Sequence, residues 1–513
     1  MPHPVSLDRP HPVYDTAATR RIEAAAQAAL PPHVLMQRAG LVLARLGMAL
    51  APHARTVWLA CGPGNNGGDG LEAAAHLQRW GLNPIVTWLG TPEKSPVDAH
   101  AAWQRARAAG VVFADAPPED LGARDLAIDA LLGIGATRAP AGAMAHWLQR
   151  LHAGPTPVLA VDVPTGLNAD TGVLAHPVVG PFTAEDGLDL SARVLAERTA
   201  PLGASAPRHT LTLLTLKPGL FTADGRDACG QLWFDDLGVA PTHPPSAWLS
   251  GAPALAPRPH ASHKGRWGDV AVVGGETDTA RGTAMTGAAL LAASAALHGG
   301  AGRVYVSPLG NAGPWLDPAQ PELMFRSFDA LALRELTVVC GCGGGDAVRA
   351  VLAPVLQSVP RLVLDADALN AIAADAGLQA ALRQRHGRAQ TTVLTPHPLE
   401  AARLLGCSAQ AVQQDRLHAA QNLAERFQSI VVLKGSGTVI AAPGSTPHLN
   451  PTGNARLATA GTGDVLAGLI GARLAAGQPT FAAACDAVYR HGAVADDWCG
   501  NTALTAAELA RRL

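Results

Sequence analysis

Short apolar runs alternate with amphipathic helical patterns along both halves of the chain. Each run has the length of a strand, and most intervening stretches repeat apolar positions every three to four residues. Strands that alternate with helices are typical of parallel sheets covered by helices, so we predict the α/β class. We expect strands at residues 56–60, 84–88, 125–129, 157–162 and 210–215, and then at 269–275, 303–306, 337–341, 361–365, 392–395 and 430–434.

The chain length indicates more than one domain, because 513 residues exceed the roughly 100–200 residues of an ordinary domain. Residues 241–265 are rich in proline, small residues and histidine, the composition of a linker. We therefore predict two domains, 1–245 and 246–513. Within the first, residues 176–208 are irregular, and we expect a surface excursion with one short helical pattern.

Charge and hydropathy exclude several classes of protein. Lys and Arg number 39 against 41 Asp and Glu, so no basic excess favours nucleic acid. No apolar stretch reaches the ~20 residues of a membrane helix, and the N-terminus lacks the pattern of a signal peptide. We expect a cytoplasmic protein that binds neither nucleic acid nor membrane. The seven cysteines form no C-x-x-C pair, and we interpret all of them, including Cys340 and Cys342, as buried, reduced thiols.

Residues 61–70, CGPGNNGGDG, follow the first strand and precede a helical pattern that begins at Leu71. A strand, a glycine loop and a helix bring backbone N–H groups to phosphate, and glycine permits positive φ and close approach of a ligand. Asn65, Asn66 and Asp69 add amide and carboxylate groups that a tight turn does not need. They indicate a binding loop, with a turn that binds nothing as the alternative.

Two later strands end in a similar way. Asp129 ends one strand before a second glycine loop, Asp162 ends the next strand, and Thr165 follows it. The carboxyl ends of parallel strands share one crevice. Oxygen groups from Asn66, Asp129 and Thr165 would suit an alkali cation better than a transition metal. The alternative is that each aspartate caps a turn.

The second half holds its own polar constellation. GTGD at residues 461–464 opens an apolar helix whose first-turn N–H groups can bind an anion. Asp464 is then either a helix cap or a base that takes a proton. KGSGT at residues 434–438 is typical of a hairpin turn beside phosphates. His397, between two prolines, is either a site residue or a structural one.

The first half resembles the NAD(P)H-hydrate epimerase domain over roughly residues 12–240, through LMQRAG, GPGNNGGDGLEAAAHL, DALLGIG, VDVPTGLNADTG and LKPGLFTADGRDACGQLWFDDLGV. The resemblance implies a Rossmann-like three-layer sandwich that interconverts the R and S hydrates, with K⁺ at Asn66, Asp129 and Thr165 and with Asp162 in the acid/base role. Thr165 replaces the family's usual serine, and either hydroxyl can ligate a cation. The implied substrate contacts are Asn65, Asn66, Gly67, Gly68, Asp69, Gly133, Ile134, Gly135, Ala136, Thr137, Arg138, Ala139 and Asp162.

The second half resembles the ADP-dependent NAD(P)H-hydrate dehydratase of the ribokinase-like superfamily from about residue 260 onward, through HKGRWGDVAVVGG, TGAALLAASAALHGGAGRVYV, TPHPLE, VVLKGSGTVIA and AGTGDVLAGLI. The resemblance implies that Asp464 takes a proton from the S-hydrate hydroxyl while ADP, with Mg²⁺, phosphorylates it; AMP and phosphate then leave. Departures are GCGGG at residues 341–345 for GPGLG, and Leu399 at a glycine position. The implied hydrate contacts are Ala288, Gly345, His397 and Asp464, and the implied nucleotide contacts are Lys434, Gly435, Ser436, Gly437, Thr438, Gly461, Thr462 and Gly463.

These features together predict a bifunctional repair enzyme for hydrated NADH and NADPH, which we expect to be a homo-oligomer acting on small molecules. One alternative is a ribokinase-like kinase of a sugar or vitamin hydroxymethyl group, with a dinucleotide-binding regulatory domain before it; it predicts a stable phosphorylated product. The other is a dinucleotide sensor or scaffold. Asp162 and Asp464 argue against the sensor, because binding alone does not need these acids.

Overall fold

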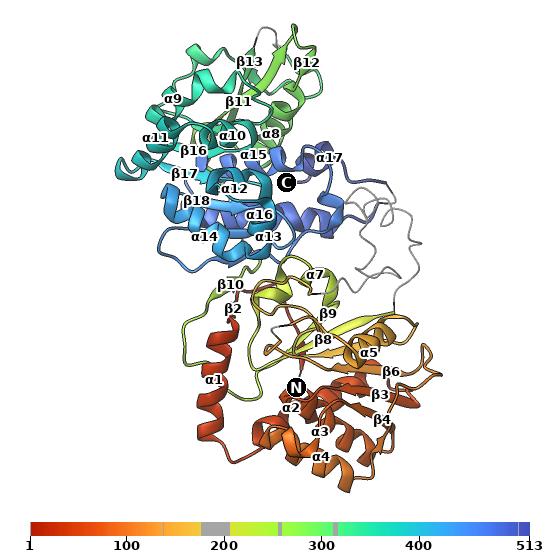
Figure 1. The fold of residues 1–513 in the computed structure, drawn as a ribbon. Helices are drawn as coiled ribbons and strands as arrows, with labels where there is room; N and C mark the ends of the chain where they lie inside the picture. Colours follow the sequence, from red (N-terminus) through yellow and green to blue (C-terminus); the bar gives the residue numbers. More distant parts are fainter. Residues whose placement is uncertain (1, 137, 176–205, 255–258, 311–315, 501) are drawn as a thin grey trace. The chain divides into compact units, whose positions relative to one another are not determined.

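The computed structural model describes residues 2–136, 138–175, 206–254, 259–310, 316–500 and 502–513 (Figure 1). The chain folds into two compact units. Unit 1 comprises the described residues of Met1–Ser6, Val13–Leu220 and Asp224–Pro245, and unit 2 comprises those of Leu7–Pro12, Phe221–Ala223 and Ser246–Leu513. Two short upstream segments therefore belong to unit 2. Every strand predicted from the sequence is present.

Unit 1 is built on a sheet in which all neighbouring strands are parallel except the first pair. Because β3 lies between β4 and β6, the strand order reverses there, and ligands collect outside the carboxyl ends of strands at such a switch point. The order is β1 (His3–Pro4), β9 (Gln231–Asp235), β8 (Arg208–Leu213), β7 (Val158–Val161), β6 (Leu126–Ala130), β3 (Thr56–Cys61), β4 (Asn83–Trp88) and β5 (Val112–Phe113).

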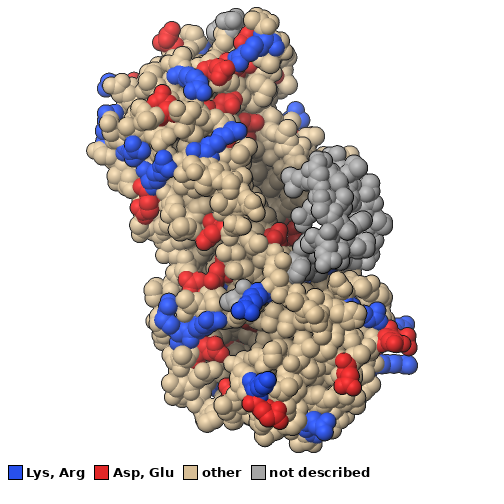
Figure 2. All heavy atoms as spheres, in the orientation of Figure 1, with Lys and Arg blue, Asp and Glu red and all other residues tan. Residues whose placement is uncertain are grey.

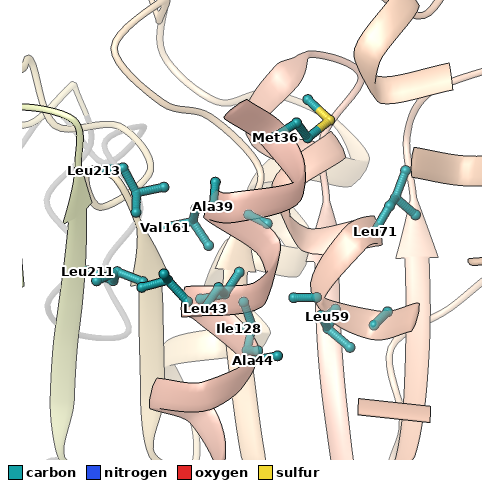
Figure 3. Close-up of a cluster of buried hydrophobic side chains, with 14 of the residues drawn as sticks. Met36, Ala39, Leu43, Ala44, Leu59, Leu71, Ile128, Val161, Leu211 and Leu213 are labelled. Atoms are coloured by element: carbon teal, nitrogen blue, oxygen red, sulfur yellow. The ribbon is translucent and has the colours of Figure 1, made fainter. Parts of the chain in front are cut away.

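Helices cover both faces of this sheet. Along β3, Val57 and Leu59 face one cluster of buried side chains and Trp58 faces another, as the two-residue period of a strand requires. The first cluster is covered by α1 (Thr16–Ala29), α2 (Val34–Leu50), α3 (Asn65–Arg79) and α4 (Val97–Ala108), and the second by α5 (Ala143–His152). Figure 3 shows Leu43 of α2 among the strand side chains of the first cluster. A short helix, α7 (Gly225–Ala228), precedes β9.

The glycine run differs from the predicted loop, because α3 already begins at Asn65. None of its glycines has a positive φ, so the left-handed conformation that glycine permits is not used in this run. A Cβ on Gly67 would lie 2.0 Å from the backbone oxygen of Gly62, and one on Gly70 would lie 2.8 Å from both the Ala130 Cβ and the Cys61 Sγ. The glycines therefore let the first turns of α3 pack directly on the strands beneath.

The sheet of unit 2 is parallel from β14 through β18 and then antiparallel across β18, β19 and β20. The hairpin predicted around residues 434–438 is confirmed, because β18 and β19 flank that turn. The order is β14 (Met324–Phe325), β13 (Arg303–Gly310), β11 (Asp269–Asp278), β15 (Thr337–Cys340), β16 (Arg361–Leu364), β17 (Thr391–Leu394), β18 (Ile430–Leu433), β19 (Val439–Ala441), β20 (His448–Leu449), β10 (Ala247–Leu249) and β2 (His11–Val13), with β12 (Thr283–Ala284) beside β11.

Unit 2 also has three layers (Figure 1). On one face α8 (Thr286–His298), α15 (Thr462–Ala475) and α16 (Thr480–Asp496) cover a cluster that includes Val272 and Val339. On the other, α9 (Val348–Ser358), α11 (Ala376–Gly387) and α14 (Arg416–Phe427) contact the strands. The remaining helices are α10 (Ala366–Ala373), α12 (Pro398–Leu405), α13 (Ala409–Gln414) and α17 (Ala506–Arg511). The predicted α/β class with two parallel-sheet units is confirmed.

The predicted linker at residues 241–265 contains a packed strand. β10 pairs with β20, and its residues Ala247 and Leu249 are fully buried. The proline-rich composition around this strand concealed three residues that complete a sheet. Residues 255–258 of the linker, and 176–205 of the predicted excursion, lie outside the described residues. The prediction that all cysteines are buried is wrong for Cys407 and Cys499, which are exposed.

Charged side chains of both signs are scattered over the face shown in Figure 2, without a basic patch on that face. Within the part of the chain that the structure describes, no helix combines the length and the apolar character needed to cross a membrane.

Candidate active sites

A cavity of about 410 Å³ opens in unit 1 where α1 and α3 meet the strand ends at the switch point. Of the predicted substrate contacts, Gly67 and Gly68 are packed inside α3, Arg138 and Ala139 lie outside the lining, and Thr137 is outside the described residues. The others all line the cavity: Asn65, Asn66, Asp69, Gly133, Ile134, Gly135, Ala136 and Asp162.

Asp162 projects into this cavity from a strained backbone. Its φ of 69° lies in the left-handed region, which a non-glycine residue adopts at an energetic cost. Its carboxylate accepts hydrogen bonds from the Leu213 N–H at 3.2 Å and from the ammonium of Lys217, which is fully buried. Lys217 also donates to the Leu213 carbonyl at 2.6 Å. Lys217 lies in the LKPG stretch and was not predicted as a site residue, although a lysine at the end of an apolar strand was the available signal.

Two further carboxyls share the cavity with Asp162. Burial, and then the charge of Asp162, raises the pKa of Asp69 well above its ordinary value, and the same two causes raise the pKa of Glu23. Glu23 and Arg20 come from α1, which the sequence analysis did not identify as part of the site. The cavity therefore combines the Asp162–Lys217 ion pair with two carboxyls whose pKa values are raised, a set suited to acid/base chemistry.

The three residues implied as cation ligands surround one short segment, residues 131–133. The Thr165 hydroxyl donates to Asp129 Oδ1 at 2.6 Å, and both residues are 1% exposed. The Thr165 oxygen also accepts from the Leu132 N–H at 3.0 Å. A Cβ on Gly133 would lie 3.1 Å from Asn66 Oδ1, so the amide abuts the same segment.

Asn66 provides the test of whether a cation fits. Its Nδ2 is buried without a hydrogen-bond partner among the described residues. The oxygen and nitrogen of an amide are nearly interchangeable in shape, so a rotated side chain would direct an oxygen to that place. An amide oxygen beside a carboxylate and a hydroxyl is a donor set that a hard cation prefers. The residues therefore fit an alkali cation.

In unit 2, Asp464 occupies the first turn of α15, whose N-cap, Gly461, has a φ of 91°. Ligand atoms of Asp464, Cys342 and Asp365 lie within 4.8 Å of one another. The Lys434 ammonium donates to Asp365 Oδ1 at 2.7 Å. A carboxylate, a helix N-terminus and a lysine therefore meet at the carboxyl end of the sheet, as the position of GTGD predicts.

Burial perturbs the pKa of four titratable groups in and around this cluster, Asp464, Glu400, Lys434 and Cys342. Burial, followed by the Asp365 charge, raises the pKa of Asp464 to about 7. Burial also raises the pKa of Glu400 to about 7, although Lys434 opposes the shift. Burial lowers the pKa of Lys434, but the carboxylates of Asp365 and Glu400 outweigh it and leave that pKa raised. Burial and the two aspartates raise the pKa of the Cys342 thiol.

His397 has a structural role in addition to any contact with substrate. Its Nδ1 accepts from the N–H groups of Leu399 at 3.1 Å and Glu400 at 3.3 Å, and Glu400 Oε2 accepts from the His397 N–H at 2.7 Å. This is a capping box at the start of α12. The H-x-x-E spacing in TPHPLE was the signal for it. Leu399, at the family's glycine position, is 46% exposed.

The remaining predicted hydrate contacts, Ala288 and Gly345, lie beside or within the GCGGG loop at residues 341–345, which also contains Cys342 of the cluster. A Cβ on Gly343 would lie 2.9 Å from the Ala288 Cβ, so Ala288 borders this loop. Gly345 has a φ of 52°, and its N–H donates to Asp367 at 2.9 Å. Cys342 stands at the family's proline position, with its thiol 4.0 Å from Asp365. Asp365 and Glu400 therefore belong to the site. They lie in residues 364–370 and 394–406, two polar stretches at the ends of predicted strands, where ligands collect in open α/β sheets, although the sequence singled out neither residue individually.

Comparison with known proteins decides the family. A model described as YjeF-related protein N-terminus matches residues 32–219, and one described as NAD(P)H-hydrate dehydratase matches residues 270–513. The chain is 36% identical to the bifunctional NAD(P)H-hydrate repair enzyme Nnr of Escherichia coli (strain K12), over 96% of the chain and 90% of that protein. The chain belongs to the bifunctional NAD(P)H-hydrate repair enzymes.

Other relatives agree with this membership. The chain is 31% identical to the Nnr enzyme of Coxiella burnetii, over 94% of both proteins. Its second half is similar to the ADP-dependent (S)-NAD(P)H-hydrate dehydratase of Neisseria meningitidis serogroup B, at 44% identity over 47% of the chain and 80% of that protein. The prediction of a bifunctional repair enzyme, an isomerase joined to a lyase, is confirmed at the level of the family.

Proposed function

We propose that domain 1–245 interconverts the R and S forms of hydrated NADH and NADPH, and that domain 246–513 dehydrates the S form at the expense of ADP. The observation that carries this proposal is the position of Asp464. Its carboxyl lies in the first turn of α15, in the same cluster as the Lys434–Asp365 pair, and its pKa is raised to about 7. A base with a pKa near the working pH is well matched to proton removal.

The dehydration needs a poor leaving group to become a good one. Asp464 takes the proton of the hydroxyl on C6 of the hydrated nicotinamide ring. The hydroxyl oxygen attacks the terminal phosphorus of ADP at the same time, and AMP leaves. The N–H groups of Gly461, Thr462 and Gly463 face the charge that grows on the transferred phosphoryl group. The C6–O bond then breaks, the lone pair of the ring nitrogen assists, a proton leaves C5, and the products are NAD(P)H and phosphate.

The epimerisation inverts the configuration at C6 of the hydrated nicotinamide ring. One bond to C6 must therefore break and form again on the opposite face of that ring. A proton must be given to the departing atom and taken back afterwards. Asp162, held by Lys217, is suited to this exchange, because its carboxylate lines the cavity of unit 1. Asp69 and Glu23, whose pKa values are raised by burial and by the charge of Asp162, supply two further carboxyls that hold a proton more tightly than an ordinary carboxyl does.

We also propose the cofactors that the resemblance implies. Asn66, Asp129 and Thr165 would hold K⁺, which supplies positive charge beside residues 131–133 when bound, and ADP would enter with Mg²⁺ on its phosphates. A cytoplasmic location and a homo-oligomeric state stay predictions from the sequence. Light scattering of the purified chain tests the second of these.

The decisive assay follows the absorbance of reduced nicotinamide after mixed R and S hydrates are incubated with ADP or ATP. Asp464→Asn should abolish recovery from both epimers, whereas Asp162→Asn should abolish recovery from R and spare S. An Asp162→Asn variant that still converts R would contradict the assignment of the first domain. A stable phosphorylated product would favour the kinase alternative instead.

A further inference from the structure

The turn at residues 434–438 is enclosed by the Phe221–Ala223 segment, which belongs to unit 2 although it lies upstream of Ser246. The Ala223 N–H donates to the Ser436 carbonyl at 3.1 Å, and the Ser436 hydroxyl donates to the Ala223 carbonyl at 2.8 Å. The segment therefore pairs with the middle of the turn through two reciprocal hydrogen bonds.

A buried threonine and a buried arginine hold the carbonyl side of the same turn. Thr222 is fully buried, and its hydroxyl lies 3.2 Å from the Ser436 carbonyl oxygen and 3.4 Å from that of Gly437. Arg416, 1% exposed, donates from Nε to the Thr222 hydroxyl at 3.2 Å and from Nη2 to the Lys434 carbonyl at 3.2 Å. Burial lowers the pKa of Arg416 to about 10, so the guanidinium keeps its charge at neutral pH.

Both glycines of the turn are explained by these neighbours. Gly437 has a φ of 63°, and a Cβ there would lie 2.0 Å from the Phe221 carbonyl oxygen. Gly435 has a φ of 136°, and a Cβ there would lie 2.9 Å from the Arg416 guanidinium. The glycines thus admit Phe221 and Arg416 on the inner side of the turn, whatever binds on the other side.

This arrangement sets the direction of the peptide groups. A trans peptide is planar, so its N–H points opposite to its C=O. Because the carbonyls of Lys434, Ser436 and Gly437 face Arg416 and Thr222, the N–H groups of the following residues face away from them. Backbone N–H groups displayed together are what a phosphate group binds.

We propose that Thr222 is a positioning residue for the nucleotide: through Arg416 and the turn carbonyls it fixes residues 434–438 in the shape that receives ADP. The inference rests on the proposed nucleotide role of those residues. It also means that the nucleotide site of unit 2 is completed by a segment outside the predicted domain 246–513.

The test uses Thr222→Val in the full chain, because valine keeps the shape and removes the hydroxyl. We expect the KM for ADP to rise about threefold to tenfold, the effect of one lost hydrogen bond, with kcat and the KM for S-hydrate unchanged. Thr222→Ser, which retains the hydroxyl, should restore the KM for ADP to near the original value.

The chain offers a matched control in Thr392 and Arg385. Arg385 Nε donates to the Thr392 hydroxyl at 2.7 Å, and the same guanidinium holds the carbonyls of Leu356 and Thr391. Both residues of this pair are at most 4% exposed. Thr392→Val therefore removes an equivalent buried hydrogen bond away from the turn, and it should leave the KM for ADP unchanged.

An unchanged KM for ADP in Thr222→Val, or an equal rise in Thr392→Val, would overturn the inference. If Thr222→Val does not accumulate as folded protein, Arg416→Lys takes its place. Lysine keeps the positive charge but lacks the planar guanidinium group, which donates several hydrogen bonds at once. An unchanged KM for ADP in that variant overturns the inference equally. Failure of the proposed function would be detected in a separate measurement. In that case the full chain without substitutions would show no ADP-dependent recovery of NAD(P)H.

Discussion

The Lys434 ammonium lies 2.7 Å from the Asp365 carboxylate, in the same cluster as Asp464. The two charges act on Asp464 in opposite directions: Asp365 raises its pKa and Lys434 lowers it, while burial raises it most. The resulting pKa of about 7 is therefore a balance among neighbours, and a change to one neighbour should move it.

This balance predicts the pH dependence of the dehydratase. Asp464 must be ionised to accept a proton, and the ionised fraction falls about tenfold for each pH unit below the pKa. At saturating ADP and S-hydrate, kcat should decrease as the pH falls below about 7, the pKa of Asp464. Glu400 has a similar pKa, so Glu400→Gln tests whether Glu400 causes this decrease in kcat. We expect the decrease, the acid limb of the pH profile, to stay at the same pH in that variant. A decrease in kcat only near pH 4 would mean that the base titrates like an ordinary aspartate, which would contradict the raised pKa of Asp464.

Lys434→Met should move that acid limb to higher pH. The substitution removes the positive charge that lowers the pKa of Asp464, so a higher pH is needed to ionise the base. The measurement is kcat against pH at saturating ADP, which separates this shift from weaker nucleotide binding. Lys264→Met, which removes an exposed lysine from the same unit, is the control and should leave the profile unchanged. A shift of the Lys434→Met limb to lower pH would contradict the balance.

The main strands could be predicted from the sequence because buried parallel strands are continuous apolar runs, a local signal. The start of α3 at Asn65 could not be predicted, because glycine has low helix propensity. The glycines stand in this helix because they allow close contact with residues that are distant in the sequence, such as Ala130. Strand β10 was missed because three apolar residues are too few to outweigh proline-rich flanks.

The candidate site divides in the same way. Asp162 and Asp464 could be identified because they stand at the ends of recognisable elements, beside glycine motifs. Lys217 could not, because what distinguishes it is burial against Asp162, which is 55 residues away along the chain. Asp365 likewise gains its importance from Lys434, 69 residues away. Pairings of this kind arise only when separate strands converge at one edge.

Lys217→Met should slow epimerisation strongly and spare dehydration of the S form. The substitution leaves the Asp162 carboxylate without its buried ammonium partner and close to the carboxyls of Asp69 and Glu23, so proton exchange should slow by about a hundredfold or more. The assay compares recovery of NAD(P)H from pure R and pure S hydrate. Lys94→Met, at an exposed position of unit 1, should retain both rates. Equal loss with both epimers would indicate a general folding defect.

The cation site predicts that K⁺ stabilises unit 1 even without substrate. An ion that binds only the folded state at a hundred times its Kd contributes about 2.7 kcal/mol. K⁺ should therefore raise the urea concentration at which half of unit 1 is unfolded, whereas Li⁺ at equal ionic strength should not. Hydrogen exchange of the β3 amides reports the unfolding of this unit. Asp129→Asn should remove the K⁺ effect. Asp125→Asn, which changes a carboxylate bonded to the Thr56 N–H at the opposite strand end, should retain it.

Gly70→Ala should destabilise unit 1 through packing alone. The added methyl would lie 2.8 Å from the Ala130 Cβ and the Cys61 Sγ, which belong to strands and cannot swing aside. Overpacking of this kind costs about 1–3 kcal/mol, more than the gain in helix propensity from glycine to alanine. Gly64→Ala is the matched control, because its φ is −98° and nothing lies within 4 Å of an added Cβ. Urea unfolding of the two variants should therefore differ by at least about 1 kcal/mol, and equal midpoints would show that α3 tolerates a wider separation from the sheet.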